Sequence, residues 1–380
     1  MILIVYFIPT WVTLDQMKIR AAVVKEQSGP FLLEELETDS LRDDEILVRI
    51  AGAGICHTDL ICRDQIYPVP LPCVFGHEGS GVVEQTGSAV KKVVAGDHVV
   101  LSFRSCGQCD ACKKGDPTHC INIFPCNFSG TRDDGTTTLN GHSGPVHGSF
   151  FSQSSFASYA ISTETNTVKV RDDIPIELLG PLGCGIQTGA GAVMNTLKPE
   201  AASSIVVFGC GSVGLAAIMA AQVVGCATII AVDPLQQRLD LASHLGASHT
   251  INPGQMDAVE QIQLITEAGA QYSLECTGLP TVLRQAVDAL SVTGVCGLVG
   301  AAPPGTECTF DMNSIMFGRT VRGIIEGDSI PDIFIPQLIE LYRQGRFPID
   351  KLITFYPLNE INQAIKDMES GKVVKPVLQP

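Results

Sequence analysis

Two short segments of the chain together supply a cysteine and a histidine that could bind a metal. Cys56 opens the run Cys-His-Thr-Asp, and His77 stands in Gly-His-Glu. Thiolate and imidazole are ligands that suit tetrahedral Zn²⁺, but two of them leave its coordination shell incomplete. Cys184, which lies between two glycines, is the candidate for the third ligand. Two cysteines, one histidine and an open position are typical of a catalytic zinc, because the open position can receive a substrate.

Taken one at a time, these residues have plainer interpretations. A single histidine is more often a satisfied structural residue than a ligand, and a single cysteine is commonly a buried thiol. The metal interpretation of His77 rests on its combination with Glu78 and with Cys56 upstream. For Cys184, the flanking glycines are the only local support.

A second group of cysteines lies in one polar loop. Cys106, Cys109 and Cys112 are each separated by two residues, and Cys120 follows eight residues later. Four thiolates fill a tetrahedral shell and leave no position for a substrate, so this spacing predicts a structural zinc. A redox cysteine pair and four unrelated core thiols are the alternatives. The loop is too polar to bury four thiols, and four cysteines in one segment favour the metal.

A glycine-rich turn in the second half of the chain lies between a predicted strand and a predicted helix. The strand is Ser204–Phe208, and the helix extends from Leu215 to Val224. The turn has the pattern GxGxxG, which in this context is a strong sign of a dinucleotide site. Its glycines permit a tight turn, close approach of the pyrophosphate and close packing of helix and strand, and the helix N-terminus offers free N–H groups to phosphate. The residues expected at the phosphates are Gly209, Gly211, Ser212, Val213 and Gly214.

The next predicted strand, Thr228–Asp233, ends on an acidic residue. Asp233 lies 19 residues after Gly214, where a carboxylate is expected to bind the hydroxyls of the adenosine ribose. Because the same carboxylate repels a 2′-phosphate, NAD is favoured over NADP as the coenzyme. Arg238 could weaken this preference, but it lies one helical turn inside the next element.

The remaining pattern predicts an α/β fold of two parts. Residues 17 to about 100 carry β-branched runs broken by glycine and proline, which predict a largely β domain. From Ser204 onwards predicted strands and helices alternate, which is typical of a doubly wound parallel sheet. Residues 121–149 are rich in Gly, Ser, Thr and Asn and are expected to form a loop. The tail is expected to return to the first part of the chain.

The domain boundaries follow from this change of pattern. The expected β-rich domain comprises residues 17–189 and 321–380, and the nucleotide domain comprises residues 190–320. Residues 1–16 are largely apolar, but they lack the basic start and the cleavage site of a signal peptide and are too few to span a bilayer. We therefore expect an N-terminal extension there, with an interface segment containing Trp11 as the alternative.

Composition narrows the class of function. The chain has 380 residues, of which 45% are hydrophobic and 17% charged, which suits a two-domain enzyme with a large core. Its net charge of −15 argues against nucleic-acid and membrane partners and leaves a small molecule as the expected partner. Fourteen cysteines in so long a chain fit metal ligation in a reducing compartment, so we expect a cytoplasmic protein.

Together these motifs resemble those of the zinc-dependent medium-chain alcohol dehydrogenases, in the same order and over nearly all of residues 17–380. Two cysteines, one histidine and an open position are the zinc ligand set known for alcohol dehydrogenase. Within the family, the segments Gly180–Gly191 and Gln153–Phe156 look like those of bacterial aryl-alcohol (benzyl-alcohol) and geraniol dehydrogenases. The resemblance implies a GroES-like β-rich catalytic domain joined to a Rossmann NAD-binding domain, with a cleft between them.

The resemblance also implies roles for individual residues. Asp59 would orient the ring of His77, and Glu78 would lie near the metal. Thr58 would accept the proton of the substrate hydroxyl. The other positions that match the family are the catalytic zinc ligands Cys56, His77 and Cys184, the pyrophosphate contacts His57 and Lys375, Val299 beside the nicotinamide, and the substrate-pocket residues Phe103, Phe150 and Phe151.

One position departs from the family pattern. Many relatives have a histidine three residues after the threonine, and this histidine is the final proton acceptor through the ribose. Here Ile61 occupies that position and cannot carry a proton. The proton must therefore leave through water or through another residue.

The expected function is reversible, NAD-linked oxidation of an aromatic or allylic primary alcohol, such as benzyl alcohol or geraniol, to its aldehyde. An aromatic pocket lining favours flat or unsaturated apolar alcohols, unless these phenylalanines pack between strands. One alternative is a polyol or S-(hydroxymethyl)glutathione dehydrogenase of the same family. The other is a zinc-ribbon binding or regulatory module, which the acidic balance of the chain opposes.

Two segments at the far side of the nucleotide domain have the pattern of sheet-edge strands. They are Thr306–Phe310 and Thr320–Ile325. Exposed strand edges favour pairing across a twofold axis. We therefore expect a homodimer, or a homotetramer built as a dimer of dimers.

The two metal sites predict a quantity that can be measured directly. Elemental analysis of the purified protein should find two zinc ions per chain, because the four-cysteine loop and the catalytic ligand set are separate sites. A value of one would remove one of the two assignments.

Overall fold

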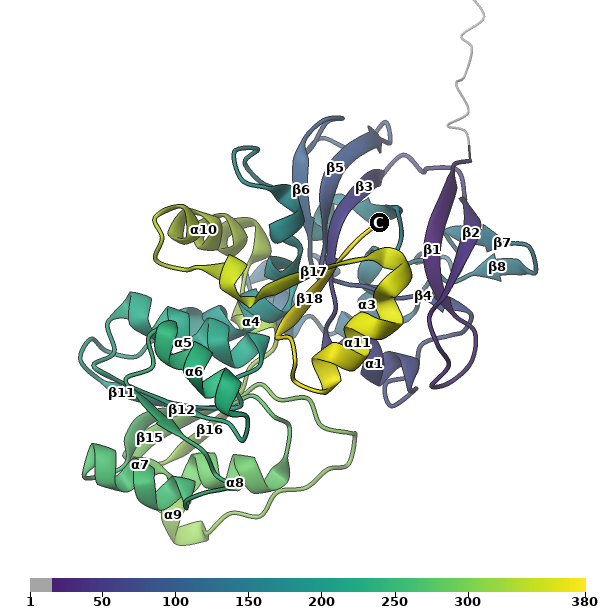
Figure 1. Ribbon diagram of the computed structural model, residues 1–380. Coiled ribbons are helices and arrows are strands. Elements are labelled where there is room, and N and C mark those ends of the chain that lie inside the picture. The colour runs from purple at the N-terminus through teal and green to yellow at the C-terminus, as the bar shows by residue number, and fades with distance from the viewer. Residues whose placement is uncertain (1–15) are drawn as a thin grey trace, which may run out of the picture.

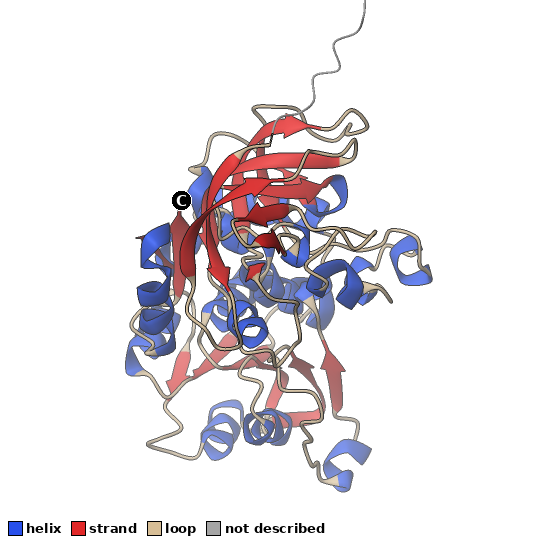
Figure 2. Ribbon diagram, turned by 90° about the vertical axis from the view of Figure 1, so that its right-hand side faces the viewer, coloured by secondary structure: helices blue, strands red, loops and turns tan. Residues whose placement is uncertain are grey.

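The computed structural model describes residues 16–380, which form two parts that lie one above the other in Figure 1. The upper part is built mainly from β-strands, and the lower part from a parallel sheet flanked by helices, as Figure 2 also shows. The N-terminal extension expected for residues 1–16 lies, except for Gln16, outside the described residues. No helix within residues 16–380 has the length and the apolar character needed to cross a membrane.

Two sheets form the β-rich part. The run EILVRIAGAG of β3 (Glu45–Gly54) is buried at nearly every position, so this strand lies at the centre of its sheet. The first sheet has the order β4-β1-β2-β7-β8, and its strands are β1 (Lys18–Val24), β2 (Leu32–Thr38), β4 (Cys73–Val74), β7 (Leu139–Gly141) and β8 (Gly144–Val146). The second has the order β10-β6-β5-β3-β18-β17 with β9 also paired to β3, and its other strands are β5 (Gly79–Thr86), β6 (His98–Leu101), β9 (Tyr159–Thr163), β10 (Thr167–Lys169), β17 (Ile353–Pro357) and β18 (Lys375–Gln379).

The C-terminal segment completes the second sheet. β18 pairs antiparallel with β3 and parallel with β17. Helix α10 (Pro331–Arg343) precedes this pair, and α11 (Ile361–Glu369) connects its two strands and lies beside the sheet in Figure 1. The last strand is thus laid directly against a strand from the first sixth of the chain, which brings Lys375 to the site described below.

The lower part is a six-stranded parallel sheet with the order β13-β12-β11-β14-β15-β16. This order is that of a doubly wound dinucleotide-binding fold, whose first strand lies at the centre. Helices α5 and α6 cover one face of the sheet and α7 and α8 the other (Figure 1), so the central strand is buried on both faces. The strands are β11 (Ser204–Phe208), β12 (Thr228–Val232), β13 (His249–Ile251), β14 (Ala270–Glu275), β15 (Leu290–Leu298) and β16 (Thr320–Gly323). The helices are α5 (Ser212–Val224), α6 (Gln236–His244), α7 (Ala258–Thr266), α8 (Pro280–Asp288) and α9 (Met312–Met316).

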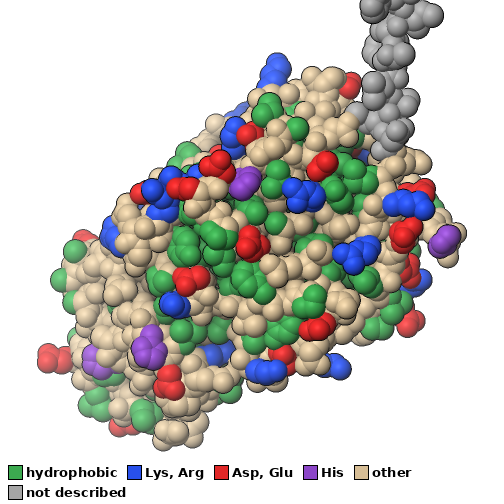
Figure 3. Space-filling model, turned by 45° about the horizontal axis from the view of Figure 1, so that its top comes forward, with side chains coloured by type: hydrophobic (Ala, Val, Ile, Leu, Met, Phe, Trp, Pro, Cys, Tyr) green, Lys and Arg blue, Asp and Glu red, His purple; other side chains and the backbone are tan. Residues whose placement is uncertain are grey.

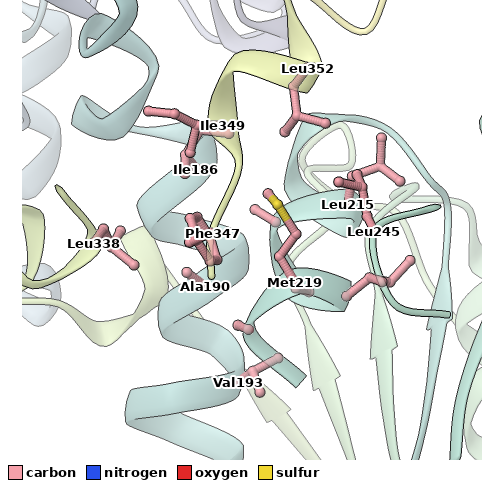
Figure 4. Close-up of a cluster of buried hydrophobic side chains, with 14 of the residues drawn as sticks. Ile186, Ala190, Val193, Leu215, Met219, Leu245, Leu338, Phe347, Ile349 and Leu352 are labelled. Carbon is pink, nitrogen blue, oxygen red and sulfur yellow. The ribbon is translucent and has the colours of Figure 1, made fainter. Parts of the chain in front are cut away.

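Helix α4 (Gly185–Gly191) lies between the two parts. It packs closely on α5, because a Cβ at Gly189 would lie only 1.9 Å from the carbonyl oxygen of Val213. An apolar core surrounds this contact (Figure 4), with Ile186, Ala190, Met219, Leu338 and Phe347 among its members. This core holds α4, and with it Cys184 at the helix N-cap, against the nucleotide-binding sheet.

The prediction of one of the two edge strands is wrong. Residues Thr306–Phe310 form no strand, because the preceding Pro303, Pro304 and Gly305 make a turn and the N–H of Thr306 is bonded back to the carbonyl of Pro303 at 3.1 Å. The other expected edge strand is present as β16 at the end of the parallel sheet. The exposed edge of the sheet is therefore formed by one strand rather than two.

The segment 121–149 is not the plain loop that its composition suggested. It contains α3 (Ile123–Phe128) and the hairpin of β7 and β8. Phe128 of α3 packs on Phe150, with ring centroids 6.0 Å apart. This contact between residues distant in sequence stabilises a short helix. The glycine- and serine-rich composition of the surrounding segment gave no indication of it.

Candidate active site

Three separate elements bring the predicted zinc ligands together. Cys56 is the N-cap of α1 (His57–Arg63), His77 and Glu78 come directly before β5, and Cys184 is the N-cap of α4. The donor atoms of these four residues all lie within 4.8 Å of one another. The segments that follow Cys56 and Cys184 are helical, so both sulfurs extend from helix N-termini toward one point.

His77 is oriented by a buried carboxylate. Asp59 Oδ1 lies 2.8 Å from Nδ1 of His77, and neither side chain is exposed. Asp59 also accepts hydrogen bonds from the backbone N–H groups of Cys56 and Gly76, at 2.9 and 3.1 Å. Burial by itself would lower the pKa of His77, but the Asp59 carboxylate raises it well above its usual value. Nδ1 faces Asp59, so Nε2 is the ring atom left for the cluster, and Nε2 has no hydrogen-bond partner among the described residues.

The two cysteines of the cluster shift each other's pKa in opposite directions. The neighbouring Cys184 side chain holds the pKa of Cys56 well below its usual value against the effect of burial, and Lys375 acts in the same direction. Cys56 and burial in turn raise the pKa of Cys184. A sulfur that favours the thiolate, a second sulfur in contact with it and an unpartnered imidazole nitrogen suit Zn²⁺, so Cys56, His77 and Cys184 fit the predicted catalytic zinc.

Glu78 and Lys375 form a buried ion pair beside these ligands. Lys375 Nζ donates to both oxygens of Glu78 at 2.9 Å and to the carbonyl of Ile55 at 3.0 Å. Burial raises the pKa of Glu78, and the ammonium of Lys375 opposes the rise. A Cβ at Gly185 would lie 3.3 Å from Lys375 Nζ and 3.4 Å from Ser212 Oγ, so the ammonium lies close to the N-terminus of α5. A contact of Lys375 with the pyrophosphate and an approach of Glu78 to the metal stay predictions.

Helix α1 carries the residues that were expected to handle the proton and the pyrophosphate. Thr58 Oγ1 lies 3.9 Å from Cys56 Sγ, so its hydroxyl is beside the metal ligands. Ile61 is buried one turn further along the same helix and has no titratable group. His57 is exposed at the first position of the helix, and its contact with phosphate stays a prediction.

A row of aromatic rings extends to the ring of His77. The ring centroids of Phe151 and Phe150 lie 4.6 and 5.7 Å from that of His77. The centroid of Phe128 lies 5.2 Å from that of Phe151, and the centroid of Phe124 lies 5.1 Å from that of Phe128. Because Phe124 is 58% exposed, this aromatic row extends from the surface to the predicted metal ligand His77.

Three members of the aromatic row were not identified from the sequence, namely Tyr67, Phe124 and Phe128. Phe124 and Phe128 are four residues apart, a spacing that puts both rings on one face of a helix and could have revealed them. Tyr67 has no such signal. Its ring lies 6.1 Å from that of Phe128, and its hydroxyl donates to the carbonyl of Ala302 in the nucleotide-binding part at 3.2 Å. The predicted pocket residue Phe103 is buried just beyond the end of β6.

An uncommon backbone conformation turns Phe150 and Phe151 toward His77. Phe151, Ser152 and Ser154 have φ angles of 50°, 52° and 49°, in the left-handed region that favours glycine. Ser154 Oγ stabilises this bend, because it accepts from the N–H of Phe150 at 3.0 Å and donates to the carbonyl of Val74 at 2.6 Å. Strain of this kind is concentrated at functional sites, which supports a role for these rings in binding a substrate.

The four cysteines of the polar loop also come together. The Sγ atoms of Cys106, Cys109, Cys112 and Cys120 all lie within 4.8 Å of one another. Backbone N–H groups, first that of Gln108, lower the pKa of Cys106 to about 6. Burial raises the pKa of Cys120 to about 12. Four sulfurs around one point, with N–H groups that stabilise thiolates, fit a structural zinc.

The glycine-rich turn has the geometry that a dinucleotide site needs. Gly209 has a φ angle of 91°, and a Cβ at Gly214 would lie 1.9 Å from the carbonyl oxygen of Gly209. At Gly211 a Cβ would meet no protein atom within 4 Å, so the space in front of this residue is open. Ser212 and Val213 form the first turn of α5 next to that space, with their N–H groups free for phosphate. The turn and the helix therefore fit a coenzyme pyrophosphate.

Asp233 lies just beyond the carboxyl end of β12, as expected for a ribose contact. Its oxygens accept from the backbone N–H groups of Cys210 and Leu235, at 2.8 and 2.9 Å. Arg238, in the first turn of α6, has its Nη1 3.8 Å from Asp233 Oδ2. Asp233 thus also shapes the glycine-rich turn, and its contact with the ribose stays a prediction. Val299, expected beside the nicotinamide, follows β15 directly.

One carboxylate of the site was not identified from the sequence. Glu326 Oε1 accepts a hydrogen bond from Cys184 Sγ at 3.3 Å, and Oε2 accepts from Gln187 Nε2 at 3.1 Å. Burial raises the pKa of Glu326 to about 7, although the charge of His77 opposes the rise. Glu326 is 142 positions from Cys184 in the chain, and its local sequence Glu-Gly-Asp-Ser has no metal-ligand spacing that could have identified it.

Two protein families match this chain over its two parts. Residues 42–172 match the alcohol dehydrogenase GroES-like domain, and residues 212–343 match the zinc-binding dehydrogenase domain. Together with the zinc-ligand cluster and the parallel sheet, these matches show that the chain belongs to the zinc-dependent medium-chain alcohol dehydrogenase family. The predicted fold, a GroES-like domain with a Rossmann-type domain, and the predicted class of enzyme, a zinc-dependent alcohol oxidoreductase, are confirmed.

The chain is similar along nearly its whole length to particular enzymes. Geraniol dehydrogenase of Castellaniella defragrans is 45% identical over 369 residues, which cover 96% of this chain and 99% of that protein. The crystal structure of benzyl alcohol dehydrogenase from Acinetobacter calcoaceticus is 50% identical with a TM-score of 0.92, and that of an alcohol dehydrogenase zinc-binding domain protein from Burkholderia ambifaria is 53% identical with a TM-score of 0.94. Each of these two matches covers 96% of this chain and 99% of the other.

Two glycines of the turn should respond differently to the same substitution. Gly214→Ala should lower the free energy of unfolding by about 1–3 kcal/mol, because the new methyl group would collide with the carbonyl of Gly209. Gly211→Ala should change it by less than about 0.5 kcal/mol and weaken NADH binding at least about 10-fold, because the methyl group enters the space in front of the helix N-terminus. Urea unfolding and fluorescence titration with NADH measure the two effects. Normal NADH affinity in Gly211→Ala would contradict the placement of the coenzyme.

Proposed function

We propose that this enzyme oxidises aromatic or allylic primary alcohols reversibly to their aldehydes, with NAD as the hydride acceptor. The observation that carries the proposal is the aromatic row, which extends from exposed Phe124 through Phe128 to Phe151 at the ring of His77. Flat or unsaturated apolar alcohols bury their surface well against such rings. The names of the geraniol and benzyl alcohol dehydrogenases to which the chain is similar support the same class of substrate.

The side chains around the metal ligands have distinct tasks in this reaction. A zinc ion held by Cys56, His77 and Cys184 would supply Lewis-acid chemistry, and NAD the capacity to accept a hydride. Asp59 holds the His77 ring, so that Nε2 keeps its lone pair directed at the cluster.

Protein residues also position the substrate and remove its proton. Phe150 and Phe151 hold the substrate side chain and exclude water, which strengthens the electrostatic interactions of the site. The substrate O–H donates its proton to Thr58 Oγ1, and the threonine hydroxyl releases its own proton in turn. Since Ile61 cannot accept that proton, it passes to water or to another side chain.

We infer a preference for NAD over NADP from Asp233. Its carboxylate sits at the end of β12 with Oδ2 bonded to the glycine-rich turn at Cys210, and a 2′-phosphate there would meet a negative charge. Arg238 lies 3.8 Å from the same carboxylate and is engaged with it, which leaves it less free to bind a 2′-phosphate. Lys375 and the first turn of α5 would then supply the positive charge and N–H groups for the pyrophosphate.

The alternative functions have less support in the structure. A polyol or a glutathione adduct needs several polar or charged partners, whereas the rings nearest His77 are those of Phe150 and Phe151. A nucleic-acid-binding module needs a basic surface. On the face of residues 16–380 drawn in Figure 3, lysines and arginines are interspersed with aspartates and glutamates, and the chain has a net charge of −15.

We propose that two copies of the chain associate through the edge strand β16. Exposed apolar side chains directly precede this strand in the chain, since Met312, Met316 and Phe317 are 86%, 69% and 63% exposed. An unpaired strand edge beside such a surface favours pairing with a second copy across a twofold axis. A dimer of dimers would need a second surface.

We also propose a cytoplasmic location. All fourteen cysteines are free, and six of them are arranged around the two predicted metal sites. Free thiols and thiolate ligands persist in a reducing compartment.

The substrate class can be tested with a panel of alcohols. With NAD, kcat/KM should be higher for benzyl alcohol and geraniol than for sorbitol and S-(hydroxymethyl)glutathione, and each value should fall with NADP.

Phe128→Ala should lower kcat/KM for benzyl alcohol by about 10-fold or more, because a wall of the ring-binding site is lost. Its kcat/KM for ethanol should change by less than about 3-fold, since ethanol is too small to reach that wall. Phe355→Ala, an exposed phenylalanine on β17, is the control. Preference for sorbitol or the glutathione adduct would overturn the proposal.

The dimer can be tested at its apolar surface. Met316→Asp should shift the protein toward the monomer in sedimentation equilibrium, because association would bury an unpaired charge. Val94→Asp, at an exposed valine of the β-rich part, should leave the mass unchanged. A dimer that resists Met316→Asp would place the interface elsewhere.

A further inference from the structure

The turn Glu326–Ser329 connects the nucleotide-binding sheet to α10. Glu326, Gly327 and Asp328 have φ angles of 50°, 64° and 46°, so three consecutive residues adopt the left-handed conformation. Two of them carry side chains, for which this conformation is unfavourable. The turn therefore needs strong contacts with its surroundings to keep its shape.

These contacts are made with α4, the helix that begins at Cys184. A Cβ at Gly191 would lie 2.3 Å from the carbonyl oxygen of Gly327, so the turn and the helix approach at backbone distance. Asn195 Nδ2 donates to the same carbonyl at 3.0 Å, and Ser329 Oγ donates to Gln187 Oε1 at 3.1 Å. The turn is thus held at Gln187 and Gly191 of α4 and at Asn195 in the helical segment Ala192–Leu197 that continues it.

The Glu326 side chain lies against the first turn of that helix. Its carboxylate accepts hydrogen bonds from Cys184 Sγ at 3.3 Å, Gln187 Nε2 at 3.1 Å and Thr188 Oγ1 at 3.4 Å. These donors are at positions i, i+3 and i+4, which form one face of a helix. One carboxylate therefore holds together the side chains of the helical turn that carries the third zinc ligand.

The other two ligands have their own supports on other elements. His77 is held by Asp59 at 2.8 Å, and the backbone N–H of Cys56 is bonded to the same carboxylate at 2.9 Å. Asp59 does not reach α4. Outside the ligand cluster, the side-chain partner of Cys184 within residues 16–380 is Glu326.

We propose that Glu326 is a positioning residue for the catalytic metal site, which keeps Cys184 at the distance and orientation that the metal requires. The proposal rests on the proposed assignment of Cys184 as a zinc ligand. When Cys184 binds metal it has no proton to donate, and the carboxylate then acts through Gln187 and Thr188, which hold the helical turn and with it the N-cap cysteine. Because Glu326 follows β16, the metal site is tied through this residue to the nucleotide-binding sheet.

Three variants of the full-length zinc enzyme test this role. In Glu326→Ala the catalytic zinc should be extracted by a chelator at least about 10-fold faster than in the wild type, because the supported ligand is loosened. Glu326→Gln retains an oxygen for Gln187 and Thr188 and can donate an N–H to the thiolate, so its rate should stay within about 3-fold of the wild type. Asp328→Asn alters the same turn at a side chain bonded to Thr196 and Arg322 and should behave as the wild type. The zinc of the four-cysteine loop is the internal reference in each protein.

The cobalt-substituted enzymes supply a second readout that does not depend on turnover. Glu326→Ala should shift the visible absorption bands of cobalt at the catalytic site, and Glu326→Gln should restore the wild-type spectrum. Equal extraction rates in Glu326→Ala and the wild type would overturn the proposal, and so would a Glu326→Gln variant as labile as Glu326→Ala. Cys184→Ala distinguishes a failure of the metal-site assignment from a failure of the role of Glu326. If it retains both zinc ions, the metal-site assignment fails, and if it loses one while Glu326→Ala loses none faster, only the role of Glu326 fails.

Discussion

The buried ion pair between Glu78 and Lys375 is the contact on which most of the site depends. It joins β5 to β18, and through the carbonyl of Ile55 and the N–H of Gly185 it also reaches the segments that begin α1 and α4. The two side chains are 0% and 1% exposed, so loss of either partner would leave a buried charge at a cost of about 3–5 kcal/mol. Since these four segments carry or adjoin all three predicted zinc ligands, we expect the last strand of the chain to help keep those residues together.

Around this pair, polar and aromatic groups divide the site into two regions of different character. Asp59 and the backbone N–H groups bonded to it hold the metal ligands from one side. The rings of Phe150 and Phe151, in a bend that Ser154 supports, pack against the ring of His77. Electrostatic interactions are stronger in such a dry environment than in water, so a few fixed charges can control a proton and a hydride there. Tyr67, bonded to Ala302, links the aromatic side of the site to the nucleotide-binding part.

Most of the fold and the metal chemistry could be predicted, because the relevant signals are local. Spacings between cysteines, a glycine-rich turn between a strand and a helix, and β-branched runs each reflect geometry within about one turn or one strand. The assignments that failed depended on neighbours distant in sequence. The helix at Ile123–Phe128 is stabilised by Phe150 rather than by its own composition, and Thr306–Phe310 is kept from forming a strand by the turn that precedes it.

By itself, then, the sequence determined the kinds of ligand, the nucleotide turn and the alternation of elements, since these follow from residue type and short spacing. Only the tertiary structure decided which side chains meet. It paired Lys375 with Glu78 across 297 positions, Glu326 with Cys184 across 142, and Tyr67 with Ala302 across 235. Local sequence periodicity does not predict such pairs. A hydrogen bond or ion pair requires two atoms within about 3 Å, whatever the number of residues between them in the chain.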